Sequence, residues 1–139
     1  MRMTAQDLRK ELRFGSPLQQ ILLAYARTFL AVISQSVACC QHHPLEQRLP
    51  RLLLTMSDYA GAGEFRMVQE SMAGLLGVRR ASVTESAQRL QAASLIRYRR
   101  GGIRILNKPR LMDKSCECYR FIRKQYSLGD ELAQLLSRK

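Results

Sequence analysis

The stretch from Gly77 to Leu90, GVRRASVTESAQRL, holds the residues whose types and spacing suggest the most specific chemistry. Two adjacent arginines precede a run of small side chains that carries a single acid, Glu85. A guanidinium group can bind a phosphate, or the O6 and N7 atoms of a guanine, through two parallel hydrogen bonds. A small residue such as Ala81 lets the backbone approach that partner closely. The stretch therefore predicts a helix whose first turn binds a polyanion.

Basic charge is concentrated around this stretch. The 139-residue chain has a formal net charge of +12 and a pI of about 10.3. Residues 79–110 contain nine basic residues and one acid, so +8 of the +12 lies within 32 residues. A soluble surface usually mixes its signs, and a local bias of this size points to nucleic acid or an anionic membrane. A solvated charged face is the alternative.

The sequence gives little support to a membrane partner. The N-terminal segment MRMTAQDLRKELRFGS is charged and lacks the apolar core of a signal peptide. The longest apolar-rich segment, Leu18 to Cys40, is interrupted by polar residues and has no run of the ~18 apolar residues that a span requires. We expect no membrane span and a cytoplasmic protein, whose four cysteines are reduced thiols.

A long helix is predicted ahead of the basic region. Ser16 is a good N-cap, Pro17 suits the first helical position, and Gln19 completes a capping box. Pro44 ends the helix near His43, which gives about 26 residues or ~39 Å.

The apolar residues of this helix form two rows with alternating steps of three and four. The first row is Leu22, Tyr25, Phe29, Val32, Ser36 and Cys39, and the second is Leu23, Ala26, Leu30, Ile33, Val37 and Cys40. We expect one row to pack on the chain's own body and the other to meet a second copy as a parallel coiled coil. The pattern leaves open which row does which. The candidate dimer interface is Leu22, Tyr25, Phe29, Val32 and Ser36.

The segment after Pro44 predicts a helix-turn-helix. An amphipathic helix carries Leu45, Leu49, Leu52, Leu53 and Met56 and ends at Gly61–Gly63, and residues 64–68 fit a small strand. Residues 69–76 read as a short helix stopped by Gly77, and residues 80–93 as a second one that buries Val83, Ala87 and Leu90. Two short helices across a glycine-containing turn are typical of helix-turn-helix.

A β-hairpin is predicted next, in LIRYRRGGIRIL. Its isoleucines and Tyr98 alternate with arginines, and Gly101-Gly102 fits a two-residue primed turn. From Pro109 on, the residues Leu111, Cys118, Ile122 and Tyr126 predict a helix, and residues 128–136 a short amphipathic tail.

The predicted fold class is therefore mainly α with a small β-hairpin wing: a long dimerisation helix followed by a winged helix-turn-helix. The predicted domains are an N-terminal arm with the long helix (1–43), the winged helix-turn-helix (44–110) and a C-terminal helical tail (111–139).

The recognition helix of a helix-turn-helix enters the major groove of DNA by its N-terminal end. Arg80 can there reach a guanine, while Ser82 and Thr84 are short enough to donate to phosphate. The candidate base-reading residues are Arg80, Ala81, Thr84 and Glu85. The candidate contacts to the DNA backbone are Arg79, Ser82, Gln69, Gln88, Arg89 and the wing residues Arg97, Arg99, Arg100 and Arg104.

Residues 67–106 resemble the DNA-binding domain of the cyclic-AMP receptor protein and fumarate–nitrate reduction regulator (Crp/Fnr) family. The residues that carry the resemblance are Gln69, Glu70, Met72, Ala73, Leu76, Gly77, Arg80, Ser82, Val83, Leu90, Leu95, Ile96 and Gly102. With the long helix and the SCECYRFIRKQY ending, the resemblance covers about residues 16–126. It implies a homodimer that binds a pseudo-palindromic operator and controls transcription, with Arg80 reading a base and Ser82 contacting phosphate.

The sequence departs from the family pattern at several positions. Ala81 stands where many members have glutamate, Glu85 where many have a second base-reading arginine, and Val68 where a threonine usually caps the first helix. Glu85 can accept from a cytosine amine or pair with an arginine of its own chain. We therefore expect a different operator. The resemblance also implies an N-terminal sensor domain, and no cyclic-nucleotide-binding pattern is found in this sequence.

The sequence gives only weak signals for a metal site or a catalytic site. Cys39 and His43 share a helix face and are weak metal candidates, and Cys116 and Cys118 form a separate C-x-C. Neither spacing is a standard zinc pattern, so buried thiols beside a helix end are the expectation, with no metal and no cofactor. Two adjacent histidines without a nucleophile motif offer no acid–base pair, so we do not expect an enzyme.

The expected partners are double-stranded DNA, a second copy of the chain and RNA polymerase. Two other functions stay open. One is an interaction protein that forms heterodimers with full-length relatives and blocks them, and the other is a non-specific DNA binder driven by charge alone.

Overall fold

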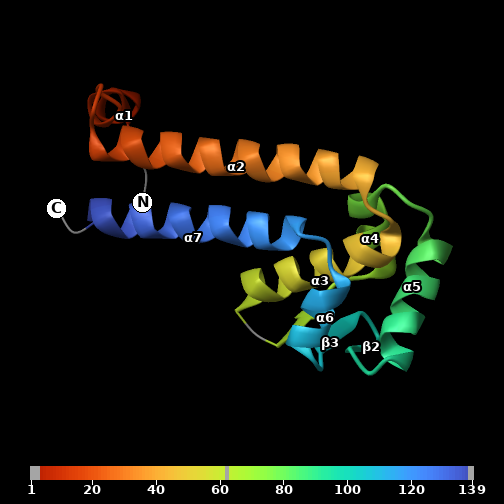
Figure 1. Cartoon of the computed structure of the whole chain (residues 1–139). Helices are drawn as coiled ribbons and strands as arrows, with labels where there is room; N and C mark the ends of the chain where they lie inside the picture. Colours follow the sequence, from red (N-terminus) through yellow and green to blue (C-terminus); the bar gives the residue numbers. More distant parts are fainter. Residues whose placement is uncertain (1–3, 62, 138–139) are drawn as a thin grey trace. The chain divides into compact units, whose positions relative to one another are not determined.

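The computed structural model describes residues 4–61 and 63–137, and the side chains of residues 128–137 are outside the description. The chain contains α1 (Ala5–Glu11), α2 (Pro17–His42), α3 (Leu45–Ala60), β1 (Glu64–Arg66), α4 (Gln69–Leu76), α5 (Arg80–Ala92), β2 (Ile96–Arg99), β3 (Gly102–Ile105), α6 (Lys108–Lys114) and α7 (Cys118–Ser137) (Figure 1). The described residues fall into two compact units. One is Gln35–Phe121, and the other comprises the residues before and after it.

The unit Gln35–Phe121 is a winged helix-turn-helix. Helices α3, α4, α5 and α6 surround a three-stranded antiparallel sheet in the order β1-β3-β2. Its core is apolar and fully buried, and includes Leu49, Leu53, Leu54, Met72, Leu76, Val83, Leu95, Ile103, Leu111 and Tyr119. The predicted fold class is confirmed, and the predicted domain boundaries stay a prediction.

Several helices begin or end beside the glycine and proline residues that predicted their ends. Helix α2 has 26 residues, with the Gln19 N–H donating to Ser16 Oγ at 3.1 Å. Helix α3 ends at Gly61, whose φ is +60°. Helix α4 begins after Val68 without a side-chain cap, as expected where threonine is replaced. Helix α1 was not predicted, and Thr4 caps it by accepting from the Asp7 N–H at 3.2 Å.

The hairpin turn lies one residue earlier than predicted. Arg99 pairs with Gly102, so the central turn residues are Arg100 and Gly101 rather than the two glycines. Both have positive φ, +49° and +79°, which a two-residue primed turn requires. In this register Ile96 pairs with Ile105 and Tyr98 with Ile103, so these four apolar side chains lie on one side of the sheet.

The segment after the wing also differs from the prediction. Residues 108–137 form two helices, α6 and α7, with a break at Ser115–Glu117, and α7 continues to Ser137 without a separate tail. The break places Cys116 in a non-helical position and Cys118 at the start of α7.

Most residues of the two predicted rows of α2 are exposed, although Val32 and Ser36 of the first row are half-buried and Cys39 is buried. Which row packs on the chain stays a prediction. Tyr25, Phe29 and Leu30 are 66%, 50% and 63% exposed, and Cys39 is the one buried residue of the helix. The less exposed stripe is instead Ile21, Ala24, Thr28 and Ala31. The helix therefore presents a broad apolar surface.

By length and composition, α2 is also apolar enough to cross a membrane, with a mean hydropathy of 1.5. The expectation of no membrane span rested on the lack of an uninterrupted apolar run, which is a different test, and it stays a prediction. The polar residues counted against it, such as Arg27 and Gln35, are too few to bring the mean below that of a span. A single helix of this kind near the N-terminus is weak evidence for membrane insertion, since interface and core helices have the same composition.

The turn between α4 and α5 requires Gly77 to adopt a left-handed backbone conformation, and this requirement can be tested. Its φ is +62°, and a Cβ built there meets nothing within 4 Å, so the cost of a side chain is backbone strain alone. Gly77→Ala is expected to destabilise the fold by about 1–2 kcal/mol. Gly74, inside α4 with equally open space, is the matched control: Gly74→Ala is expected to stabilise by about 0.5–1 kcal/mol. Urea unfolding of both variants measures the two signs, and two changes of the same sign would contradict this account.

Candidate nucleic-acid interface

Helix α5 has one buried and one open face. Val83, Ser86, Ala87 and Leu90 are buried, and Ser86 is the member that the sequence pattern did not predict. The exposed residues are Arg79, Arg80, Ala81, Glu85, Gln88, Arg89 and Ala92. They follow one stripe along the helix, so the predicted base-reading positions other than Thr84 share an open face.

The start of α5 suits an anion. Arg79 occupies the N-cap position, and its side chain makes no cap hydrogen bond. The first backbone N–H groups of a helix have no intrahelical partner, and together with the helix dipole they favour a phosphate. The guanidinium groups of Arg79 and Arg80 make no ion pair or hydrogen bond with any residue that the structure describes. Both are therefore free to bind an external partner.

Thr84 and Gln69 are held together inside the motif. The Thr84 hydroxyl lies 2.8 Å from Gln69 Oε1 at the start of α4, and 3.0 Å from the carbonyl oxygen of Arg80. This contact joins the first residue of α4 to the second turn of α5. The structure thus gives Thr84 a part in positioning the two helices, whereas Arg80, Ala81 and Glu85 are open to solvent.

Farther along the stripe, Arg89 is paired within the chain. Its Nη2 lies 3.2 Å from Glu46 Oε1 of α3, with both side chains more than half exposed. Glu85 makes no ion pair with the described residues, although pairing with an arginine of its own chain was one of its two predicted roles. Its carboxylate remains available as an acceptor on the open face.

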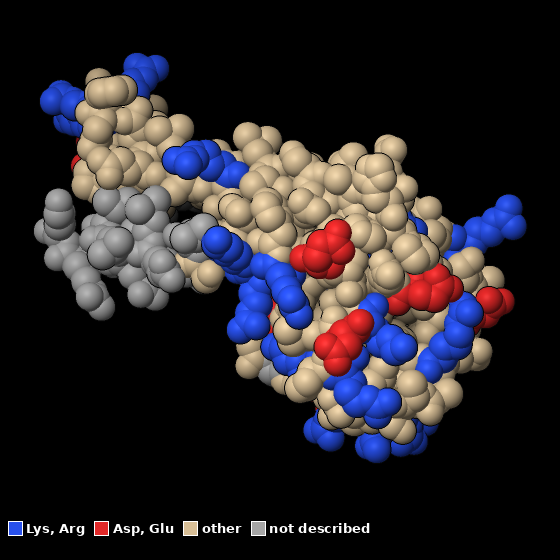
Figure 2. Space-filling model, viewed as in Figure 1, with Lys and Arg blue, Asp and Glu red and all other residues tan. Residues whose placement is uncertain are grey.

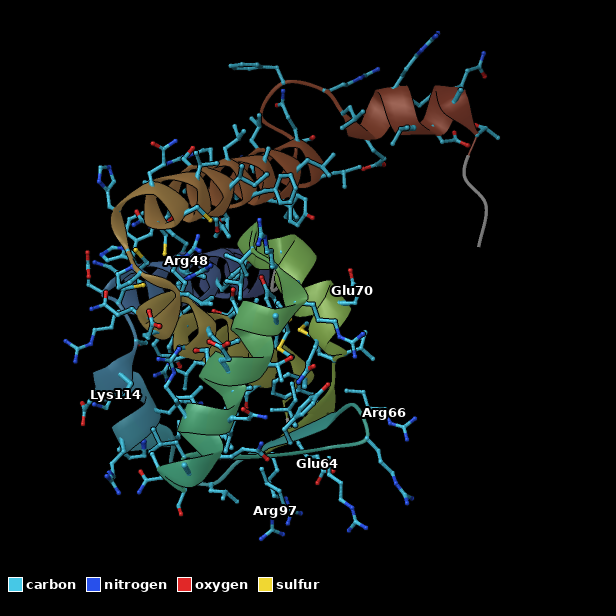
Figure 3. The ribbon with its side chains drawn as sticks, turned by 90° about the vertical axis from the view of Figure 1, so that its right-hand side faces the viewer. Arg48, Glu64, Arg66, Glu70, Arg97 and Lys114 are labelled. Carbon is cyan, nitrogen blue, oxygen red and sulfur yellow. The ribbon has the colours of Figure 1, made fainter. Side chains whose placement is uncertain are left out.

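The wing presents arginines on its outer face. Arg97 pairs across the strands with Arg104, and Arg104 Nε lies 3.2 Å from Glu64 Oε2 of β1. Arg97, Arg99 and Arg104 line a shallow hollow with Arg100, Glu64 and Gly102. In Figure 3, the side chains of Arg97 and Glu64 point away from the ribbon at this face. Figure 2 shows Lys and Arg side chains along the lower edge of the view, where Figure 1 places the hairpin.

The charge balance of the wing favours phosphate. Among the described residues, Arg97, Arg99 and Arg100 have no ion-pair partner, so one acid faces four arginines there. Like charges placed opposite each other across strands destabilise a sheet unless a counter-ion joins them. The shift of the turn also places Arg100 at the tip of the hairpin, beyond the end of β2.

The cysteines and histidines are not part of this surface. Cys39, His43, Cys116 and Cys118 come together elsewhere in the same unit, although the sequence predicted only Cys39 and His43 as weak metal candidates. Cys40 and His42 are exposed and lie outside this group. The break between α6 and α7, which the sequence pattern did not predict, brings the C-x-C to the end of α2.

Comparison with known proteins agrees with this architecture. Residues 47–114 match the family model of the Crp-like helix-turn-helix domain. None of the curated proteins compared with the chain matches it. The fold is similar to the crystal structure of a protein from Eubacterium rectale described as a transcriptional regulator of the Crp/Fnr family, with a TM-score of 0.60 and 22% sequence identity. That alignment covers 84% of this chain and 52% of the other, so the chain spans about half the length of that regulator.

The match includes most of α3, the helix-turn-helix, the hairpin and α6, and so contains residues 67–106, on which the sequence resemblance mainly rested. Residues 47–114 therefore form a Crp-like helix-turn-helix domain, the DNA-binding domain that this chain shares with the Crp/Fnr family of transcription regulators.

Proposed function

We propose that this chain regulates transcription as a sequence-specific homodimer that inserts α5 of each copy into the major groove of a pseudo-palindromic operator. The observation that carries the proposal is the open stripe of α5. It begins with two unpaired arginines at an uncapped helix start and lies in the same unit as an arginine-faced wing. In this proposal the protein works in the cytoplasm, with RNA polymerase as a further partner.

Specific roles follow from the geometry. Arg80 reads a guanine, Ala81 allows close approach, and Glu85 accepts from a cytosine amine. Arg79, Ser82, Gln69, Gln88 and Arg89 and the wing residues Arg97, Arg99, Arg100 and Arg104 hold the DNA backbone. Thr84 supports this arrangement through its bond to Gln69, because that bond fixes α5 against α4.

The apolar surface of α2 supports the dimer. Leu22, Tyr25 and Phe29 are 46%, 66% and 50% exposed, and the rings of Tyr25 and Phe29 stack with centroids 6.0 Å apart. Exposed apolar patches of this kind usually mark an interface. In this proposal the recognition helices of the two copies enter the DNA about 34–36 Å apart, which is one turn of DNA.

Selection of duplexes from a random library by the purified chain, at about 150 mM salt, tests the proposal. The expected product is an inverted repeat with half-sites about 10 base pairs apart. A single half-site without a repeat would remove the dimer from the proposal. No enriched sequence would favour a non-specific binder or an interaction protein.

The wing gives a separate prediction. Arg97→Ala is expected to weaken binding to all duplexes by a similar factor, because Arg97 contacts phosphate and reads no base. The slope of log K against log salt should become shallower by about 0.9. Fluorescence anisotropy at several salt concentrations measures both effects. Arg120→Ala, an exposed arginine in the first turn of α7, is the matched control with no expected change. A loss confined to the selected operator would place Arg97 among the base-reading residues.

A further inference from the structure

Three thiols and one imidazole meet at the junction of α2, α6 and α7. The ligand atoms of Cys39, His43, Cys116 and Cys118 all lie within 4.8 Å of one another. The Cys39 and Cys116 sulfur atoms are 3.5 Å apart, and Cys118 Sγ is 3.6 Å from His43 Nδ1. The three cysteines are buried and form a small core cluster of their own. Residues from two ends of the unit thus converge on one point.

We propose that Cys39, His43, Cys116 and Cys118 bind one zinc ion as a structural site with three thiolate ligands and one imidazole ligand. Three cysteines and a histidine are an established ligand set for tetrahedral structural zinc. With Zn–S bonds of about 2.3 Å and Zn–N bonds of about 2.0 Å, the ligand atoms of such a site lie about 3.5–3.8 Å apart. The two distances above already have these values.

The surroundings of His43 fit a metal ligand. His43 Nε2 lies 3.1 Å from Glu117 Oε1, while Nδ1 faces the Cys118 sulfur. A carboxylate that accepts from Nε2–H leaves the lone pair on Nδ1, which is the nitrogen inside the cluster. Histidine ligands of zinc regularly donate their second nitrogen to a carboxylate in this way, and that contact fixes the ring.

The sulfur ligands have outer partners as well. The Gln35 amide donates to Cys118 Sγ at 3.0 Å. Arg51 is buried, and its positive charge acts on Cys39. Zinc with three thiolate ligands has a net charge of −1, which a buried cation such as Arg51 offsets.

The unpaired Arg51 guanidinium is an independent reason to expect a negative charge at the cluster. Its Nε has no hydrogen-bond partner among the described residues, and a buried cation is costly unless an opposite charge accompanies it. Arg48 lies beside sulfur atoms at the end of α2 in Figure 3, and its Nη1 donates to the carbonyl oxygen of Cys40 at 3.3 Å. The site would join the helix before the winged helix-turn-helix to the segment after it.

Adjacent residues in the sequence provide matched controls for the test. The full chain is purified from cells grown with added zinc, passed through a desalting column, and analysed by inductively coupled plasma mass spectrometry. We expect about one zinc per chain, which Cys39→Ser and His43→Ala lose and which Cys40→Ser and His42→Ala keep. Circular dichroism verifies that each variant is folded. Equal zinc contents in the two members of each pair would overturn the proposal.

Two further readouts do not depend on co-purified metal. Titration of the metal-free chain with Co²⁺ should give the intense visible bands of a tetrahedral thiolate site, with one equivalent at saturation. Glu117→Gln should keep the site and weaken zinc binding about 10–100-fold in competition with a chelator. Iron with sulfide in place of zinc, a Cys39–Cys116 disulfide in the freshly purified chain, or absence of cobalt bands would each overturn the proposal.

Discussion

Arg80→Ala is expected to reduce affinity for the selected operator by about 1–3 kcal/mol, or roughly 5–150-fold in Kd. The loss arises because Arg80 is exposed at the first turn of α5 and has no partner within the described chain, so its guanidinium is available for a guanine. Binding to unrelated duplexes should change far less, because one charge among many contributes to the non-specific term. Anisotropy titrations of the operator and of a scrambled duplex give both numbers.

Arg80→Lys separates the effect of the paired guanidinium hydrogen bonds from the effect of the positive charge. Lysine keeps the positive charge but cannot make the paired contact to O6 and N7 in the same geometry. We expect this variant to keep its affinity for the scrambled duplex and to lose discrimination at one base pair of each half-site. Equal losses on operator and scrambled duplexes, in both variants, would mean that Arg80 contacts phosphate.

Phe29→Asp is expected to convert the dimer into monomers and to abolish operator binding. Phe29 is half exposed in the single chain, and burial of a phenylalanine contributes about 1.5–3 kcal/mol. A symmetric interface contains two copies of this side chain, and burying a carboxylate in place of each ring has a further free-energy cost. The dimer Kd should therefore rise at least about 100-fold. Sedimentation equilibrium measures the dimer, and anisotropy measures operator binding.

Ser34→Asp is the control for the added charge. Ser34 is exposed on α2 and belongs to neither apolar row, so this variant should remain dimeric and bind the operator. A dimeric Phe29→Asp would place Phe29 outside the interface. Leu30→Asp, in the second row, then tests whether the interface lies on the neighbouring stripe, where Leu30 is 63% exposed. Membrane association of the purified chain would give the apolar surface of α2 a different role.

Local signals made the helices of the motif predictable from the sequence. Pro17 and Pro44 bracket α2, and Gly77, with its positive φ, separates α4 from α5. These residues act through their own backbone restrictions, which are independent of the rest of the fold. The alternating residues of β2 and β3 likewise predicted the face of the wing that is buried.

Features set by distant contacts were not predictable in the same way. The turn at Arg100 and Gly101 follows from the pairing of β2 with β3. The apolar alternation alone fits a turn at either position, because the two pairings differ by two residues and keep the same side chains on the same face. Two adjacent glycines suggested a turn one residue later. The break between α6 and α7 has no glycine or proline at its centre, and the apolar spacing from Leu111 to Cys118 resembled one helix.

The cluster of thiols shows the same limit more clearly. Cys39 and Cys116 are 77 residues apart, so no spacing rule for local zinc motifs could join them. A signal was present in retrospect. The sequence holds two short ligand motifs, C-x-x-x-H and C-x-C, on either side of a domain whose ends lie close together in space. Close termini are common in compact domains.

The most direct test of the central claim is a pair of selections from one random duplex library, with the wild-type chain and with Arg80→Lys, at about 150 mM salt. We predict an inverted repeat from the wild type and the same repeat from the variant, with one guanine position of each half-site now degenerate. Identical repeats from both proteins, or no repeat from the wild type, would contradict the proposal that α5 reads the operator through Arg80.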